Sequence, residues 1–250
     1  MEFERIADEK RLQFIINTLQ QKLPKGAEVL DVGCGNGVIS RSLGARGFTV
    51  RGIDVSEKAI ARAKQLNVYD NVRFDVVSAE QLVADGQRYH AVICSEVLEH
   101  LHEPGKLLEV LYQTLHENGV LIVTVPNGKG PRELMVTRPV ISLSKKNNWL
   151  WKLVLKVKSA LGYKGTTVQS DADDLTHIQF FTKSSLEQLA EKTNFRIVRF
   201  GKTNFIEDVF PFSFLTKRMK FLQQWDCALA EKLPYSFTGG FVTVWEKKQP

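Results

Sequence analysis

Three glycines stand at alternate positions in the stretch Asp31-Val-Gly-Cys-Gly-Asn-Gly37, directly after an apolar run. Glycine leaves the backbone bare, so a ligand can approach the main chain closely. A helix-like run begins at Val38, and the free N–H groups at a helix start favour an anionic or polar group. The dinucleotide fingerprint has its third glycine five residues after the first, where this chain has Val38. The spacing therefore argues against NAD and for another nucleoside, and Asp31 offers a carboxylate for a cationic group.

A second acid, Asp54, follows the alternating β-branched run 48–53 and lies 21 residues after Gly33. In nucleotide-binding α/β folds, an acid at the end of the second strand binds the ribose hydroxyls. Asp54 or Ser56 can also act as the N-cap of a helix over 57–65. Ribose binding and capping are therefore both open for Asp54.

A third group of polar residues, Ser95-Glu-Val-Leu-Glu-His-Leu101, follows another apolar run. Carboxylates and imidazole are ligands for Mg²⁺ or similar ions, so Glu96, Glu99 and His100 form a candidate metal site. His100 can alternatively cap the loop after it. His177 is a candidate general base, or else a residue that packs on Phe180. His100 and His177 are the predicted catalytic residues.

Alternating strand and helix patterns surround these residues. The β-branched runs predict strands at 28–32, 48–53, 72–77, 89–94, 120–125, 195–200 and 241–245. Helical periodicity is found at 5–22, 37–45, 57–65, 104–116 and 219–233, with another helix starting at Thr182 or Ser184. This alternation predicts one α/β domain over 1–250, with a doubly wound, mostly parallel sheet. Because such sheets bind ligands at the carboxyl ends of their strands, we expect the polar groups above to share one site.

The β–α rhythm stops after Gly128, and residues 129–176 form a predicted helical insertion after the fifth strand. Between Lys129 and Lys164 there are nine Lys and Arg and one acid, so this segment carries +8 and the rest of the chain −2. Residues 145–161 include a basic amphipathic helix with Trp149 and Trp151. It is either a lid over the site or a peripheral contact with an anionic membrane.

With these motifs, the chain resembles the class I S-adenosylmethionine-dependent methyltransferases, whose glycine motif, Asp/Glu-x-Gly-x-Gly-x-Gly, matches residues 31–37. The resemblance implies S-adenosylmethionine as cofactor and a Rossmann-like, seven-stranded sheet whose last two strands are an antiparallel pair. It implies a cofactor site that comprises Asp31, Gly33, Cys34, Gly35, Asn36, Gly37, Asp54, Val55, Ala79, Glu80 and Ser95. Ser78 stands where the family often has Asp, which weakens the expectation of a hydrogen bond to the adenine amine. Glu80 is alternatively a surface residue.

Within this superfamily the chain is similar to the ubiquinone-biosynthesis O-methyltransferases, through residues 30–35, 95–101, 127–130 and 176–183. The similarity implies methyl transfer to an oxygen of a small molecule, with Arg11 on the cofactor's carboxylate and a divalent ion at Glu96, Glu99 and His100. The alternative is a membrane-associated enzyme that acts on a quinone precursor or another lipidic acceptor. Because the insertion is longer here and the chain differs after residue 200, the acceptor's identity does not carry over.

Composition and motifs limit the class of protein and the compartment that the sequence allows. Hydrophobic residues make up 43% and charged residues 25% of the chain, as in ordinary globular proteins. No apolar run is long enough to span a membrane, the N-terminus lacks a signal-peptide core, and three cysteines without ligand spacing indicate a reduced, cytoplasmic compartment. We expect no nucleic-acid partner, since no Asn-Pro-Pro-Tyr motif follows the fourth strand. A cofactor-binding regulator without turnover remains open, as does the oligomeric state.

Overall fold

The computed structural model describes residues 5–84, 86–131, 134–135, 177–206, 209, 216 and 219–248. The helices of this part are α1 (Ile6–Lys22), α2 (Val38–Gly44), α3 (Glu57–Leu66), α4 (Ala79–Ala84), η1 (Leu98–His100), α5 (Pro104–Thr114), α8 (Lys183–Lys192), α10 (Lys220–Lys232) and η3 (Tyr235–Phe237). The strands are β1 (Glu28–Val32), β2 (Thr49–Asp54), β3 (Val72–Val76), β4 (Tyr89–Ser95), β5 (Leu115–Pro126), β6 (Phe195–Lys202) and β7 (Gly240–Lys247).

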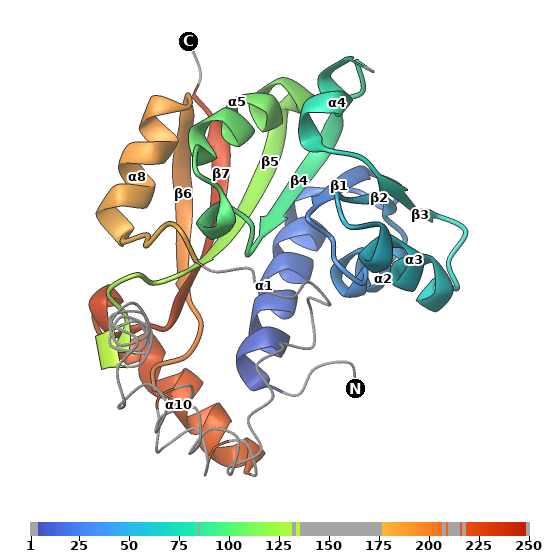
Figure 1. The fold of residues 1–250 in the computed structure, drawn as a ribbon. Helices are drawn as coiled ribbons and strands as arrows, with labels where there is room; N and C mark the ends of the chain where they lie inside the picture. Colours follow the sequence, from blue (N-terminus) through green and yellow to red (C-terminus); the bar gives the residue numbers. More distant parts are fainter. Residues whose placement is uncertain are drawn as a thin grey trace, which may run out of the picture.

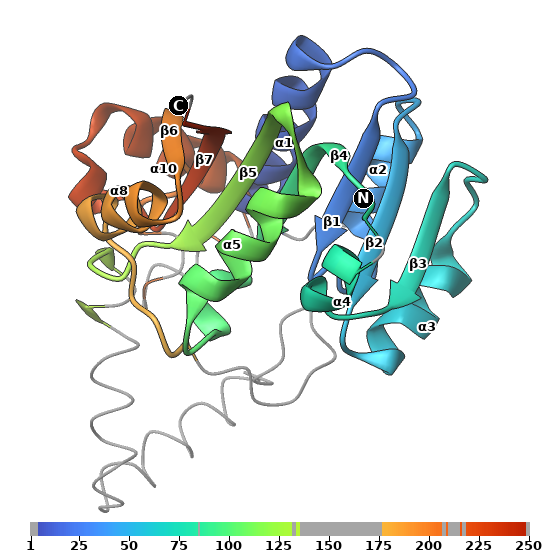
Figure 2. The same ribbon diagram turned by 90° about the horizontal axis from the view of Figure 1, so that it is seen from above.

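The strands form one sheet in the order β3-β2-β1-β4-β5-β7-β6. Strands β1 to β5 pair in parallel, and β7 runs antiparallel between β5 and β6. Figure 2 shows the arrowheads of β1, β2, β3 and β5 at one side of the molecule. The strand order reverses between β1 and β4, where such sheets bind ligands. The predicted doubly wound sheet with an antiparallel β6–β7 pair is therefore confirmed.

Helices cover both faces of the sheet (Figure 1). Alternate residues of each buried strand point to opposite faces. Leu30 therefore belongs to the core that includes residues of α4, α5 and α8, and Val29 to the core that includes residues of α1, α2 and α3. Helix α10 lies against α1, where the side-chain oxygen of Gln223 accepts from Ile6 N at 2.9 Å. The two cores hold the carboxyl ends of β1, β2 and β4 in fixed register.

Local capping explains several helix starts. Ser56 Oγ accepts from Ala59 N at 3.2 Å and so caps α3. Thr182 and Ser185 form a reciprocal capping box at the start of α8, and Pro104 occupies the first turn of α5. These N-caps agree with the sequence prediction for Ser56 and Thr182.

Some boundaries differ from the sequence prediction. Helix α4 was not predicted, because its six residues are too short for a periodic pattern. Helix α5 ends at Thr114 and β5 begins at Leu115, whereas the sequence predicted a helix to residue 116 and a strand from residue 120. Almost all of the predicted insertion, including the helix within 145–161, lies outside the described residues. Among the described helices, none has the length and hydropathy of a transmembrane segment.

Candidate functional site

The glycine turn after β1 has the left-handed backbone that glycine favours. The φ angles of Gly33, Gly35 and Gly37 are 66°, 53° and 79°. A Cβ on Gly33 would lie 2.5 Å from Val97 Cγ2, and one on Gly37 would lie 2.4 Å from Phe74 Cζ. Side chains at these two positions are therefore excluded by both conformation and packing.

Asp54 fixes this turn from the end of β2. Its Oδ2 accepts from Gly35 N and its Oδ1 from Ser56 N, both at 2.9 Å. Each carboxylate oxygen retains a lone pair that can accept from a ribose hydroxyl. The next residue, Val55, is 76% exposed and adds apolar surface at the same edge. Since Ser56 caps α3, Asp54 is available for the ribose contact that the sequence predicts.

Asp31 is buried behind the turn rather than exposed to a cation. Its Oδ2 accepts from Ser40 Oγ at 2.6 Å, which ties β1 to α2. Burial raises the pKa of Asp31 to about 7, although the Ser40 hydrogen bond lowers it and Asp54 raises it. The described partner of Asp31 is thus a hydroxyl group, and its contact with the cofactor stays a prediction.

The other predicted turn residues shape the same loop. Asn36 presents its carbonyl to Arg41 Nη1, which fixes the loop to α2. Cys34 is half-buried, and burial raises the pKa of its thiol, so the thiol stays protonated. Ala79 is buried at the start of α4, beyond β3. Glu80 also belongs to α4, but its side chain is outside the described part of the structure.

Arg11 reaches from α1 to the end of β4, and its predicted contact with the cofactor's carboxylate stays a prediction. Its Nη2 lies 3.3 Å from Glu96 Oε2, and its Nη1 lies 3.5 Å from Asp8 Oδ1. Arg11 Nε is buried without a hydrogen-bond partner in the described structure. The guanidinium is therefore held at the sheet edge with one donor unused.

Glu96 has a role that the sequence did not reveal. Its φ of 58° is unusual for a residue with a side chain. Its Oε1 accepts from Thr124 Oγ1 at 3.0 Å, and Thr124 Oγ1 lies 2.9 Å from Ser95 Oγ. The backbone conformation thus turns Glu96 toward β5 and Arg11.

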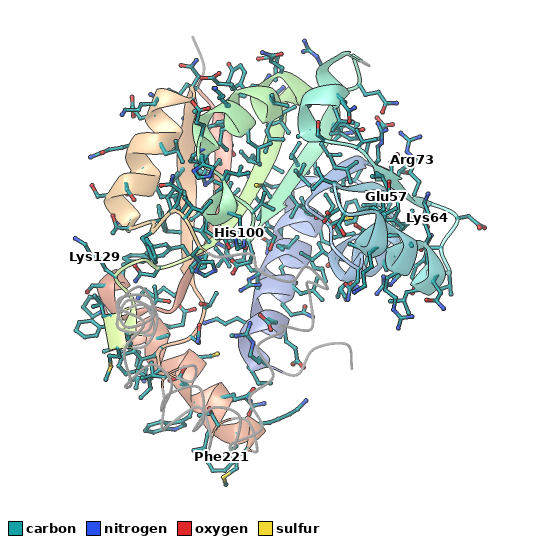
Figure 3. The ribbon with its side chains drawn as sticks, viewed as in Figure 1. Glu57, Lys64, Arg73, His100, Lys129 and Phe221 are labelled. Atoms are coloured by element: carbon teal, nitrogen blue, oxygen red, sulfur yellow. The ribbon has the colours of Figure 1, made fainter. Side chains whose placement is uncertain are left out.

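Glu99, His100 and His177 form a cluster beyond the end of β4, and Figure 3 labels His100 there. One ligand atom of each residue lies within 4.8 Å of those of the other two, and the two imidazole rings are 5.2 Å apart. The carbonyl of Glu99 accepts from Ile178 N at 2.8 Å and Gln179 N at 2.9 Å. These backbone bonds bring His177 beside His100, although 77 positions separate them in the sequence.

The carboxylate of Glu99 is the most unusual group of this cluster. Glu99 is 1% exposed, and neither carboxylate oxygen has a hydrogen-bond partner among the described residues. His100 Nε2 lies 3.8 Å from Oε1, beyond hydrogen-bonding distance. Burial, and then the charge of Glu96, raises the pKa of Glu99 well above its usual range. A buried carboxylate without a hydrogen bond is costly, so it marks a site that a cation or a proton would satisfy.

The donor set differs from the predicted metal triplet. Glu99 and His100 are close together, but the third member is His177, and Glu96 contacts Arg11 and Thr124 instead. Two imidazoles and one carboxylate suit borderline ions such as Zn²⁺ better than Mg²⁺, which prefers oxygen ligands. The residues therefore fit a divalent ion, but the geometry does not support Mg²⁺.

The glycine turn and the Glu99 cluster are direct neighbours. Val97, whose side chain fills the space that a Cβ on Gly33 would need, immediately precedes η1. The predicted cofactor residues come from the ends of β1, β2 and β4 and from the segment after β3, and they lie along one sheet edge. The site thus has a glycine turn with bare backbone at one side and an acid–imidazole group at the other.

Comparison with known proteins gives a family for this arrangement. A family model described as a methyltransferase domain matches residues 3–199. A ubiquinone biosynthesis O-methyltransferase from Psychrobacter cryohalolentis is 35% identical over 107 residues, which are 41% of this chain and 42% of that protein. The matches span between 42% and 55% of the length of the curated relatives, so they cover about half of each.

Solved structures agree on the fold. Magnesium protoporphyrin IX methyltransferase from Synechocystis PCC 6803, with bound S-adenosylhomocysteine, has a TM-score of 0.57 and 19% identity and covers 98% of this chain and 84% of its own. The [4+2]-cyclase SpnF also has a TM-score of 0.57, with 16% identity and 95% and 82% coverage. At such identities the likeness concerns the fold alone, and the pair of names illustrates that one fold serves different reactions.

Proposed function

The chain belongs to the methyltransferase-domain family and is an S-adenosylmethionine-dependent methyltransferase, and from this premise we propose that it methylates an oxygen atom of a small molecule. The observation that carries the proposal is the cluster of buried Glu99 with half-buried His100 and His177 beside the glycine turn. An oxygen acceptor must lose a proton, and this group can take one up.

The cofactor supplies an activated methyl group when it is bound. The bare backbone of Gly33 and Gly35 allows close approach, and Asp54 accepts from the ribose hydroxyls. Arg11 holds the carboxylate of the methionine part with the guanidinium that otherwise contacts Glu96. These residues align the donor, which is the main task in a methyl transfer.

His177 accepts the proton of the acceptor in this proposal. A phenol has a pKa near ~10, so a base next to the oxygen raises the fraction that reacts. His100 lies against His177 and Glu99 and orients the base. In the alternative arrangement, Glu99, His100 and His177 would together hold a divalent ion, which would supply a positive charge that favours deprotonation of the acceptor. His177 would then be a ligand of the ion and not the base.

The names of the relatives support an oxygen acceptor. Curated proteins that are 32–35% identical to this chain over 105–130 residues are ubiquinone biosynthesis O-methyltransferases. The acceptor itself is not transferred from them, because the matches cover about half of each protein.

A second candidate is action on a lipidic acceptor, such as a quinone precursor, at a membrane surface. Phe221 and Trp225 of α10 lie four positions apart on one helix face and are 58% and 70% exposed, as in helices that bind the bilayer interface. The chain also carries a net charge of +6. Flotation with vesicles that contain anionic lipid tests this candidate, and absence of binding at low salt would exclude it.

The direct test of the oxygen-acceptor proposal is an acceptor screen that measures release of S-adenosylhomocysteine. We expect turnover with phenols and little with amines or carboxylates, and a loss of about 100-fold in the His177→Ala variant. Turnover with amines alone would refute oxygen transfer. Addition of a chelator, with and without Zn²⁺, then separates an ion in the cluster from a proton-transfer role of the histidines.

A further inference from the structure

A cavity of about 350 Å³ lies at the opposite edge of the sheet, where β4 and β5 begin and β7 ends. Its lining comprises Gly86, Gln87, Arg88, Tyr112, Gln113, Thr114, Glu117 and Lys247. None of these residues belongs to the methyl-transfer site, which lies at the carboxyl ends of the parallel strands. The cavity therefore requires an explanation of its own.

Lys247 is the buried cation of this cavity. Its side chain is 4% exposed, and its ammonium group contacts Glu117 Oε1 at 2.9 Å. The same ammonium lies 4.4 Å from the ring centre of Tyr112, a cation–π distance. A charge this deeply buried requires a counter-charge, and in the described structure Glu117 supplies it.

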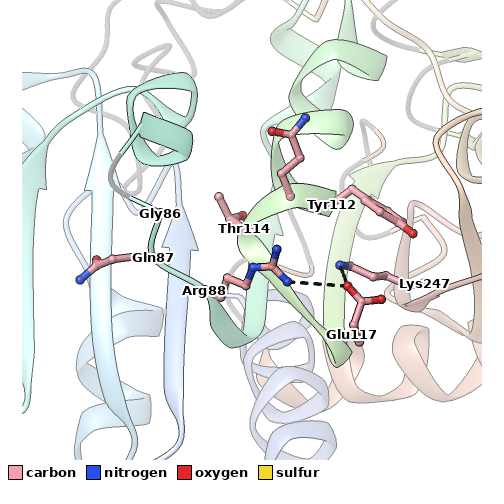
Figure 4. Close-up of a pocket in the computed structure, with 8 residues that line it drawn as sticks. Gly86, Gln87, Arg88, Tyr112, Thr114, Glu117 and Lys247 are labelled. Atoms are coloured by element: carbon pink, nitrogen blue, oxygen red, sulfur yellow. Dashed lines mark hydrogen bonds and ion pairs between the residues drawn. The ribbon is translucent and has the colours of Figure 1, made fainter.

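Arg88 converges on the same carboxylate oxygen from the other side, as Figure 4 shows. Its Nη1 lies 3.8 Å from Glu117 Oε1, and its side chain is 53% exposed. The described lining thus has two cations and one acid around a single oxygen atom. One carboxylate leaves this pair of cations with a net positive charge, which favours an additional or a better anion.

Glu117 is the least constrained member of the group. Its side chain is 72% exposed, and it lies in the irregular start of β5, where the pairing with β4 changes register. Lys247, in contrast, is fixed on β7 between its two contacts. The exposed carboxylate of Glu117 can move into solvent without disturbing the core, whereas the ammonium group of Lys247 stays buried.

We propose that this cavity is a binding site for a small molecule with a carboxylate or phosphate group, which takes the place of Glu117 between Arg88 and Lys247. Guanidinium and ammonium groups both bind oxyanions, and the guanidinium can do so through two N–H donors. The ring of Tyr112 forms one wall, and Gln113 and Thr114 line the cavity beside it. Glu117 acts as the internal counter-ion that keeps Lys247 paired until the ligand arrives.

Calorimetric titration of the purified full chain with inorganic phosphate, and separately with acetate, tests the proposal at constant ionic strength in chloride. We expect the Glu117→Gln variant to bind the anion about tenfold more tightly than the wild type, because the competing charge is gone. The double variant Glu117→Gln/Arg88→Gln should lose that gain. The two anions show whether phosphate or carboxylate is preferred.

The matched control is Glu103→Gln, which removes the acid of another exposed ion pair, 2.5 Å from Lys106, with no buried cation behind it. Anion affinity in this variant should equal that of the wild type. An equal increase in both Gln variants would mean general charge screening and would overturn the proposal. Absence of anion binding in Glu117→Gln would overturn it as well.

A thermal melt gives an independent measurement if the calorimetric heat is small. Phosphate should raise the melting temperature of Glu117→Gln more than that of the wild type, because a ligand of the native state stabilises it. An equal shift in both proteins would count against the site. Neither experiment involves methyl transfer, so its outcome is separate from that of the proposed function.

Discussion

Buried titratable groups occur at both edges of the sheet: the carboxyl edge, where the parallel strands end beside the glycine turn, and the amino edge, where β4 and β5 begin beside Lys247. The two edges differ in how these groups are paired. At the amino edge, Lys247 has a carboxylate and an aromatic ring. At the carboxyl edge, both oxygens of Glu99 lack a hydrogen-bond partner among the described residues, and Asp31 has one hydroxyl donor. Since a buried carboxylate without a hydrogen bond destabilises a fold, we explain these groups at the carboxyl edge by binding or catalysis. At the amino edge the buried ammonium already has a carboxylate, so the proposed ligand binds there by taking the place of Glu117.

The contrast predicts opposite dependences of stability on pH. The pKa of Asp31 is raised to about 7 in the folded chain and is ~3.9 when unfolded. Between these values the native state holds more protons, so the free energy of unfolding falls as pH rises from about 4 to 7, by at most roughly 4 kcal/mol. Urea denaturation without cofactor at pH 5 and pH 7.5 should show this fall, and Asp31→Asn should reduce it. If the free energy of unfolding of Asp31→Asn fell with pH as steeply as that of the wild type, the buried-carboxylate explanation would be contradicted. Because burial also raises the pKa of Glu99, this residue contributes a dependence of the same sign.

Replacement of Glu99 separates function from stability most directly. We expect Glu99→Gln to lower kcat by about 100-fold, because the cluster loses its carboxylate. The free energy of unfolding should stay equal or rise, since neither oxygen makes a hydrogen bond in the described structure. Turnover and urea denaturation measure the two effects, with exposed Glu103→Gln as the control. Full activity together with lower stability would make Glu99 a structural residue.

Asp54 provides a smaller, binding-specific effect at the same edge. Asp54→Asn should weaken S-adenosylhomocysteine binding by about tenfold or more, since hydrogen bonds to a charged acceptor contribute ~1.5–3 kcal/mol each. Calorimetry of the variant measures this, with exposed Asp70→Asn as the control. Equal affinity in wild type and Asp54→Asn would remove Asp54 from the cofactor site.

The sequence predicted the sheet and the carboxyl edge of its strands better than it predicted the cluster of Glu99, His100 and His177. The strand ends follow from local alternation, so residues such as Gly35 and Asp54 could be placed together in advance. The pairing of His100 with His177 depends on backbone bonds from Glu99 to Ile178 and Gln179, which no local pattern encodes. The sequence likewise predicted Glu96 as a metal ligand. In the structure Glu96 contacts Arg11 instead, and neither this contact nor its unusual φ could be read from the sequence, because both arise only in the folded chain.

Substitutions at the amino edge should cause the smallest changes in stability. The dependence of stability on pH there should have the opposite sign to that of Asp31. Glu117→Gln should lower the melting temperature by a few degrees, because Lys247 then stays buried without its carboxylate. Lys247→Met should melt at the wild-type temperature or above, since it removes the buried charge and keeps the apolar stem. The hydrogen bond from Lys247 lowers the pKa of Glu117, so this pair loses its stabilisation as pH falls through the acidic range, whereas Asp31 gains it. Scanning fluorimetry of both variants from pH 3 to 8 (about the range in which carboxyl groups titrate) measures these shifts. If Lys247→Met were as destabilised as Glu117→Gln at pH 7, the pair would be a packing element, and the distinction between the two edges would fail.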